Sequence, residues 1–288
     1  MNDRIQTSRR ALALLLLFAS GLHADTLVLK NGQTISGRSF LRQGDVILVS
    51  VGTDGKPPAP GKGTPVAEIE SVECDPPAVL KSAPAMLAQG KGSAVLESVR
   101  TALAAGEVFG VLPGSSWPDL LVLQAHILVA TGKDEEATKL TYAMEKSKNP
   151  DLVRDSQALR ALIAIRKDER YQTDPMLETL GNEMTKPATR AAVAVTRGLL
   201  ELEKKQFEEA LKSFLELPVF LPDQTALSGI AQLGAAQAYY GMEDYDRAIA
   251  ALEALVKTRP DTPEIPRAQS LLPEWQRRRT AVQEAKEP

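Results

Sequence analysis

Cysteine and histidine, which most often hold metal ions or serve as nucleophile and base, are scarce in this chain. Its 288 residues include one cysteine, Cys74, and two histidines, His23 and His126. A single cysteine excludes an internal disulfide. Cys74 is therefore expected either to link two chains or to be a buried, inert thiol at the end of a strand. So few cysteines and histidines also fall short of a tetrahedral metal site, and we expect no metal and no cofactor.

The chain also lacks an apolar run long enough to cross a membrane. Its most apolar stretch, residues 11–22, is shorter than the roughly 20 residues that a transmembrane helix needs. This stretch follows three arginines, and its last residue begins Leu22-His23-Ala24, a candidate cleavage sequence; the layout is typical of a secretory signal peptide. We expect residues 1–24 to be removed and the mature protein to be periplasmic or secreted, with no transmembrane span. The general secretory route is favoured over the twin-arginine route, which stays open.

Charge and histidine content argue against nucleic-acid binding and catalysis. The net charge is −3, and it becomes more negative when residues 1–24 are removed with their three arginines. An acidic protein matches a phosphate backbone poorly, so no nucleic-acid partner is expected. After cleavage only His126 would remain for a Ser-His-Asp or Cys-His arrangement, and it lies in an apolar stretch. We assign no catalytic residue and interpret the chain as a non-enzyme.

One pattern of residues occurs twice in the second half of the chain. A small residue is followed by an aromatic, an alanine, a large apolar residue and a proline, at identical spacing in both copies. The copies are Gly198, Phe207, Ala210, Phe214 and Pro222, then Ala236, Tyr245, Ala248, Leu252 and Pro260. Small residues at fixed distances from aromatic ones predict a helix hairpin whose two arms approach closely.

Apolar periodicity defines the hairpin of the first copy. It predicts a helix over residues 191–204, then a turn, then a second helix over 208–217 that Pro218 ends. Both copies resemble the tetratricopeptide repeat, whose consensus has a small residue, aromatics, alanine and proline at these positions. The aromatic Tyr239 adds a further match in the second copy.

Weaker copies of the repeat extend toward the N-terminus. Residues 118–150 and 157–187 keep parts of the pattern, and a further helix pair is expected over 78–105, split near Gly90. The resemblance implies a mainly α fold, a tetratricopeptide-type α-solenoid of about 4–5 hairpins over residues 76–288. A C-terminal helix over residues 265–286, kinked at Pro273, is expected to cap it.

Residues 25–75 have the period of strands instead. Short apolar runs alternate with turn signals such as Asn31-Gly32, and a loop rich in glycine and proline covers residues 52–63. Four or five short strands in so few residues predict a small all-β, barrel-like domain. This segment resembles the SH3-like or Sm-like modules at the start of exported bacterial proteins, which bind a partner or pack against their own chain.

The resemblance to tetratricopeptide repeats also implies a concave groove lined by the first helix of each hairpin. Repeat positions place eight candidate partner-binding residues there: His126, Val195, Leu199, Leu202, Ile230, Leu233, Gln237 and Tyr240. Most of them are apolar, where relatives that capture a carboxylate have charged or amide side chains. Two interpretations stay open. These side chains pack under a neighbouring element, or they form an apolar groove for an amphipathic helix or extended peptide.

Together these features predict a non-enzymatic scaffold or adaptor of the bacterial cell envelope that binds an unidentified protein or peptide. The alternative is a self-assembling structural or cell-wall-associated protein that forms homo-oligomers through the β module or the groove. An exported enzyme is disfavoured because catalytic side chains are missing.

Overall fold

The computed structural model describes residues 24–57, 61, 63–169, 173, 176–177, 180, 186–259 and 262–285. The chain forms two compact units. One holds the residues up to Asp75 together with Leu112–Gly114, and the other holds Pro76–Val111 and the residues from Ser115 onward. The expected signal peptide, apart from Ala24, lies outside the described residues.

The N-terminal unit contains two small antiparallel sheets of three strands each. They have the orders β2-β1-β6 and β3-β4-β5. The elements are β1 (Asp25–Leu29), β2 (Thr34–Gly37), β3 (Ser39–Gln43), β4 (Val46–Val51), β5 (Thr64–Pro65), the 3-10 helix η1 (Val66–Glu68) and β6 (Ile69–Glu73). The predicted barrel is wrong, because the sheets do not close on themselves. β5 has only two residues, and Pro65 lacks the N–H that would continue the pairing.

The chain changes sheets at a glycine. Gly37 pairs with Asp25 of β1, whereas the next N–H, that of Arg38, donates to the carbonyl oxygen of Val51 at 2.8 Å. A Cβ at Gly37 would lie 2.8 Å from Val49 Cγ1, so only glycine permits this approach.

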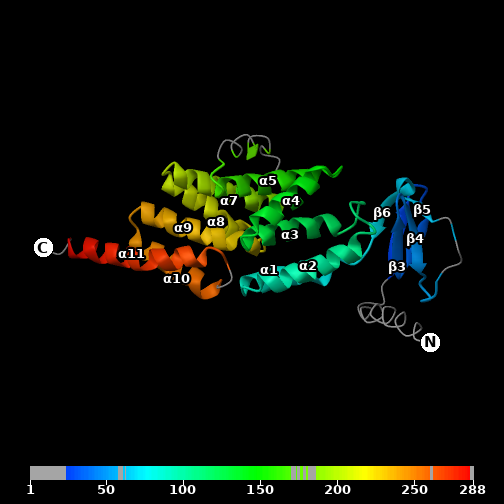
Figure 1. Cartoon of the computed structure of the whole chain (residues 1–288), viewed down its shortest axis with the longest axis horizontal. Coiled ribbons are helices and arrows are strands. Elements are labelled where there is room, and N and C mark those ends of the chain that lie inside the picture. The colour runs from blue at the N-terminus through cyan, green and yellow to red at the C-terminus, as the bar shows by residue number, and fades with distance from the viewer. Residues whose placement is uncertain are drawn as a thin grey trace, which may run out of the picture. The chain divides into compact units, whose positions relative to one another are not determined.

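The second unit is a run of antiparallel helices, each packed against its neighbours in the sequence (Figure 1). The helices are α1 (Ala78–Ala88), α2 (Gly92–Gly106), α3 (Trp117–Ala130), α4 (Asp134–Glu145), α5 (Pro150–Arg166), α7 (Pro187–Glu203), α8 (Phe207–Phe220), the 3-10 helix η2 (Thr225–Leu227), α9 (Ser228–Gly241), α10 (Tyr245–Thr258) and α11 (Ile265–Glu284). This mainly helical architecture confirms the predicted solenoid-like fold. None of the described helices is long and apolar enough to span a membrane.

Several predicted helix boundaries shift. α7 begins at Pro187 rather than at residue 191, because proline is well suited to the first position of a helix. α8 continues past Pro218 and ends at Phe220. Leu217, 2% exposed, anchors the last turn of α8, and its carbonyl oxygen still accepts from Leu221 N at 3.0 Å. A proline in a last turn removes one hydrogen bond without ending the helix.

The aromatic ring of Phe214 joins three helices. Phe214 lies on α8 and is 1% exposed. A Cβ added to Gly198 of α7 would lie 2.7 Å from this ring, and one added to Gly234 of α9 would lie 2.3 Å from it. The small residue of the repeat is thus small because the ring occupies its side-chain space. In the next hairpin, Ala248 and Leu252 stand at the repeat positions of Ala210 and Phe214, and both are fully buried.

We predict that Gly234→Ala destabilises the protein by about 1 to 3 kcal/mol, because the new methyl group overpacks against Phe214. Alanine is the better helix former, so helix propensity alone predicts the opposite sign. Urea unfolding followed by circular dichroism measures the difference.

Gly106→Ala is the matched control, because a Cβ there would meet Trp117 Cδ1 at an ordinary 3.6 Å. It should stay within about 0.5 kcal/mol of the parent protein. Replacing Phe214 by leucine in the Gly234→Ala background should cost less than the two single changes added together. Equal stability of Gly234→Ala and the parent protein would refute this packing.

Candidate functional site

The helical unit has a first groove, of about 570 Å³, and five of the eight predicted partner-binding residues line it. These are Leu199, Leu202, Ile230, Leu233 and Gln237. The first two lie on α7 and the others on α9, because the same repeat positions of successive hairpins fall side by side. Ile165 of α5 and Phe207 of α8 complete a mainly apolar floor.

An ion-pair network forms part of the rim of the first groove. Arg166 at the end of α5 lies 3.5 Å from Asp134 Oδ2 through Nε and 3.1 Å from Glu264 Oε1 through Nη1. Glu264 directly precedes α11 and has a side chain only 7% exposed. Its Oε2 would lie 3.3 Å from a Cβ at Gly229, at the start of α9, where helix polarity favours a carboxylate. The network therefore joins the starts of α4 and α11 to the end of α5 beside the apolar floor.

Two of the other predicted residues are used in packing. Val195 is fully buried in the main core cluster. Tyr240 stacks on Trp275 of α11, with ring centroids 4.4 Å apart and planes 19° apart, and meets Tyr245 edge-on at 5.3 Å. Tyr240 thus holds the C-terminal helix in place.

His126 lines a second cavity, of about 1000 Å³, elsewhere in the helical unit. This second cavity lies between α1, α3, the start of α7 and the connection from α8 to α9. The connection is held on both sides: Thr225 Oγ1 donates to the carbonyl oxygen of Pro84 at 3.0 Å, and Arg259 Nη1 donates to that of Thr225 at 3.1 Å. Leu227 at its end is fully buried. The connection from α8 to α9 thus forms one wall of the second cavity, which His126 also lines.

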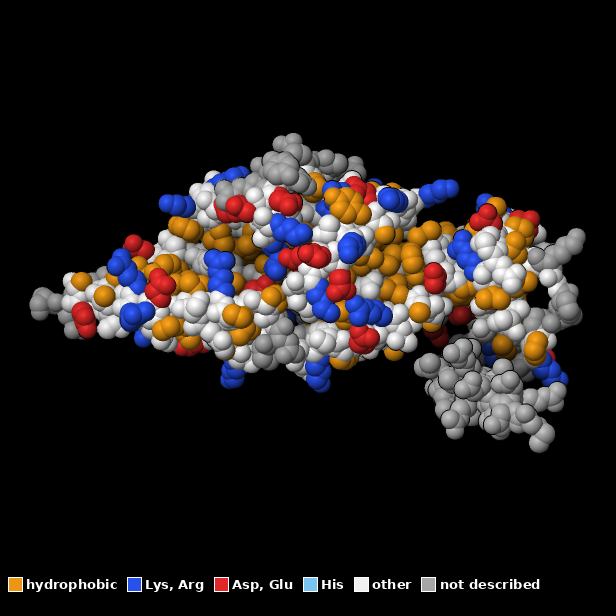
Figure 2. Space-filling model, viewed as in Figure 1, with side chains coloured by type: hydrophobic (Ala, Val, Ile, Leu, Met, Phe, Trp, Pro, Cys, Tyr) orange, Lys and Arg blue, Asp and Glu red, His pale blue; other side chains and the backbone are white. Residues whose placement is uncertain are grey.

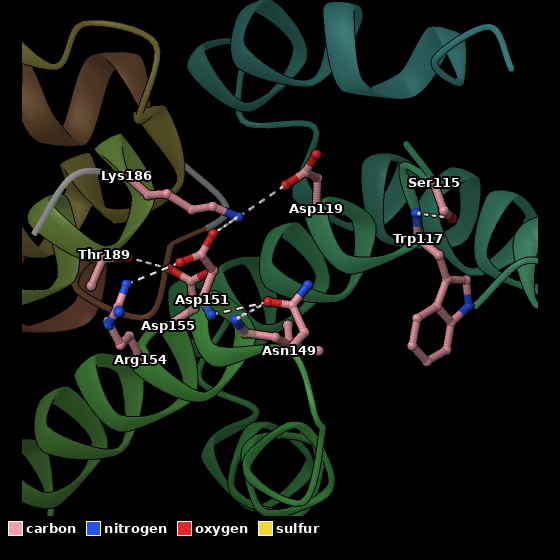
Figure 3. A network of polar contacts seen from close by, with 10 residues as sticks. Ser115, Trp117, Asp119, Asn149, Asp151, Arg154, Asp155, Lys186 and Thr189 are labelled. Carbon is pink, nitrogen blue, oxygen red and sulfur yellow. Dashed lines mark hydrogen bonds and ion pairs between the residues drawn. The ribbon is translucent and has the colours of Figure 1, made fainter. Parts of the chain in front are cut away.

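Acidic side chains gather at the helix starts beside the second cavity (Figure 3). Lys186 Nζ lies 3.7 Å from Asp119 Oδ1 of α3 and 3.8 Å from Asp151 Oδ2 of α5. Asp155, one turn further along α5, accepts a hydrogen bond from the Thr189 hydroxyl through Oδ1, whereas its Oδ2 has no hydrogen-bond partner. Burial raises the pKa of Asp155, and the Thr189 hydrogen bond and Lys186 only partly oppose this.

Only isolated acidic residues near expected helix starts point to this network in the amino-acid sequence. Such residues normally favour the helix N-terminus and nothing more. Its members come from α3, α5 and the N-cap of α7, and only the fold brings these three elements together.

His126 is 3% exposed, and burial lowers its pKa from 6.5 to about 4. The imidazole is therefore neutral at physiological pH, as expected of a structural histidine. The described residues contain no group of three or more His, Cys, Asp or Glu side chains placed to hold a metal ion. Cys74 follows β6 and is partly buried, with its thiol donating to the carbonyl oxygen of Gly114 at 3.8 Å.

We predict that His126 makes the protein less stable as pH falls from 6.5 to 4. In this window the unfolded chain binds the proton and the folded chain does not, so protonation favours unfolding. The shift corresponds to at most about 3 kcal/mol. Thermal melts of the parent protein and His126→Leu at both pH values measure it. The variant should lose less stability than the parent, whereas parallel losses would contradict the buried neutral imidazole.

Residues 230–262 match the family model for the tetratricopeptide repeat. The matched segment covers most of α9, all of α10 and the start of the loop before α11, which is the second copy of the repeated pattern. No curated protein matches the chain. The tetratricopeptide repeat is a module for protein–protein interaction, so the match connects the first groove, to which α9 contributes, with that class of function.

Proposed function

We propose that this protein is a non-enzymatic adaptor whose first groove binds a segment of a protein partner. The observation that carries the proposal is the convergence of Leu199 and Leu202 of α7 with Ile230, Leu233 and Gln237 of α9 in one groove beside the matched repeat. A volume of about 570 Å³ lies within the range of roughly 300 to 1,000 Å³ that is usual for binding pockets.

The chemistry of the groove favours a segment with an apolar anchor and a polar backbone. Leu199 and Leu202 are only partly buried, so a partner side chain would remove their remaining apolar surface from water. The rim offers side chains of both signs, including Arg166, Glu264 and Arg267. On the face of the helices seen in Figure 2, Lys and Arg side chains are interspersed with Asp and Glu ones. Such a surface leaves recognition to the apolar floor and local hydrogen bonds.

We predict that a photo-crosslinking amino acid at Gln237, in the lining of the first groove, captures the partner in the native host. The same amino acid at Lys257, an exposed position of α10 outside the groove, should capture little or none. Mass spectrometry identifies the crosslinked chain, and crosslinks between two copies of this chain would instead indicate self-assembly.

Leu202→Glu tests the apolar floor in the same assay. An unpaired charge there should reduce crosslinking about tenfold or more, because the contact would bury the carboxylate. Leu215→Glu is the matched control, since Leu215 is 37% exposed on α8 and lies outside the groove. Circular dichroism checks that both variants fold. Equal crosslinking of Leu202→Glu, Leu215→Glu and the parent protein would contradict the groove as the binding site.

The place of action that we propose is the cell envelope. The support is the order of three arginines, the apolar stretch 11–22 and Ala24 in the sequence. N-terminal sequencing of the protein from its host should find Asp25 as the first residue. A chain in the cytoplasmic fraction that still begins with Met1 would contradict export.

A further inference from the structure

Asp155 is a buried carboxylate that the fold does not fully satisfy. It is 2% exposed, Thr189 bonds only its Oδ1, and Oδ2 has no hydrogen-bond donor. Asp119 and Asp151 lie in the first turns of α3 and α5, where the helix N-terminus stabilises a carboxylate. Asp155 lies beyond that first turn. A buried acceptor without a donor is costly, so its position in a cavity wall indicates a donor that comes from outside.

The walls of the second cavity carry one more carboxylate than ammonium group. The charged residues that line it are Lys81, Asp119, Asp155, Lys186 and Asp223. His126 is neutral and changes nothing in this balance. Lys186 Nζ is 3.7 Å from Asp119 Oδ1, beyond hydrogen-bond length, so this carboxylate is only loosely neutralised, whereas Asp151 also pairs with Arg154 at 3.0 Å. When Asp155 is ionised, a single monovalent cation in the cavity balances the charge, and such a cation favours the ionised form over the protonated form that burial favours.

Apart from His126, Gln224 and Thr225, the rest of the wall is apolar. Side chains from α1 and α3 supply most of this surface: Leu80, Ala83, Leu87, Val122 and Leu123. Carboxylates in the wall of an apolar cavity match a ligand that has a positively charged head and a hydrocarbon stem. Lysine and arginine side chains have this form, because their methylene groups pack on apolar surface while the head keeps its hydrogen bonds.

We propose that the second cavity binds the ammonium or guanidinium head of a lysine or arginine side chain from a partner polypeptide, with Asp155 and Asp119 as its acceptors. The stem lies along α1 and α3. Asp155 Oδ2 gains a donor, and Thr189 keeps Oδ1 in place. This site is separate from the first groove, so it adds a basic residue to what the protein recognises.

The test uses small probes and needs no identified partner. The ¹⁵N-labelled protein is titrated with n-butylammonium and n-butylguanidinium, and with n-butanol as the neutral control, while NMR follows backbone amide shifts. We expect saturable shifts near Asp119, Asp155 and Lys186 for the two cations and none for n-butanol. Nα-acetyl-lysine methylamide should bind at least as well as n-butylammonium. If this lysine derivative does not bind although n-butylammonium does, the ligand is a free amine and the proposal of a polypeptide side chain is wrong.

Two variants in the cavity carry the decisive comparison. Asp155→Asn should weaken n-butylammonium binding roughly tenfold or more, because a charge-assisted hydrogen bond is lost. It should melt no lower than the parent protein at pH 7, since the amide oxygen still accepts from Thr189 and no charge is buried. Asp119→Asn tests the second proposed acceptor. The Asp119 side chain is 61% exposed, so this change should not disturb folding. Asp134→Asn, on the rim of the first groove, should bind like the parent.

Two further results would overturn the proposal. One is equal affinity of the parent protein for n-butanol and n-butylammonium. The other is parent-like affinity for n-butylammonium in both Asp155→Asn and Asp119→Asn. Neither result bears on the first groove, which the Gln237 crosslink and Leu202→Glu test separately.

Discussion

The structure of the helical unit depends on one contact, the ring of Phe214 packed between two glycines. A side chain on either Gly198 or Gly234 would overlap this ring, so α7, α8 and α9 can approach only in the observed register. That register places the groove-lining residues of α7 beside those of α9. The positions of Leu202 and Leu233 in the first groove therefore follow from the contact that also defines the repeat.

The chain's own loops give its two hollows different chemistry. The connection from α8 to α9 reaches α1 through Thr225 and Pro84, and it forms one wall of the second cavity. The segment before α11 supplies Glu264 to the rim of the first groove. In the first groove, Asp134 and Glu264 each leave one carboxylate oxygen without a hydrogen-bond partner, but both carboxylates pair with Arg166 beside an apolar floor. In the second cavity, Asp155 Oδ1 accepts only from the neutral hydroxyl of Thr189 and Oδ2 lacks a donor. An adaptor with both hollows recognises an apolar anchor and a basic side chain separately.

Local patterns predicted the helices well and the joints between elements poorly. Periodicity and the glycine–phenylalanine spacing located α7 to α10, because these features act within one hairpin. The repeat period then placed five predicted residues of two successive hairpins in one groove. The sheet switch at Gly37 was missed, since it depends on the side chain of Val49 across the unit. The approach of Asp155 to Lys186 was also missed, because only packing of α5 against α7 brings them together. Tyr240 occupies a groove position of the repeat, yet α11 covers it.

The central claim is that the first groove is where a partner binds, and hydrogen–deuterium exchange of the full chain with and without its captured partner tests it most directly. Amides that become protected on binding report which segments the partner covers or orders. We predict that protection increases chiefly in peptides that cover Leu199–Glu203 of α7 and Ile230–Gln237 of α9, and that α10 changes little. Protection confined to the strands of the N-terminal unit, with α7 and α9 unchanged, would contradict it.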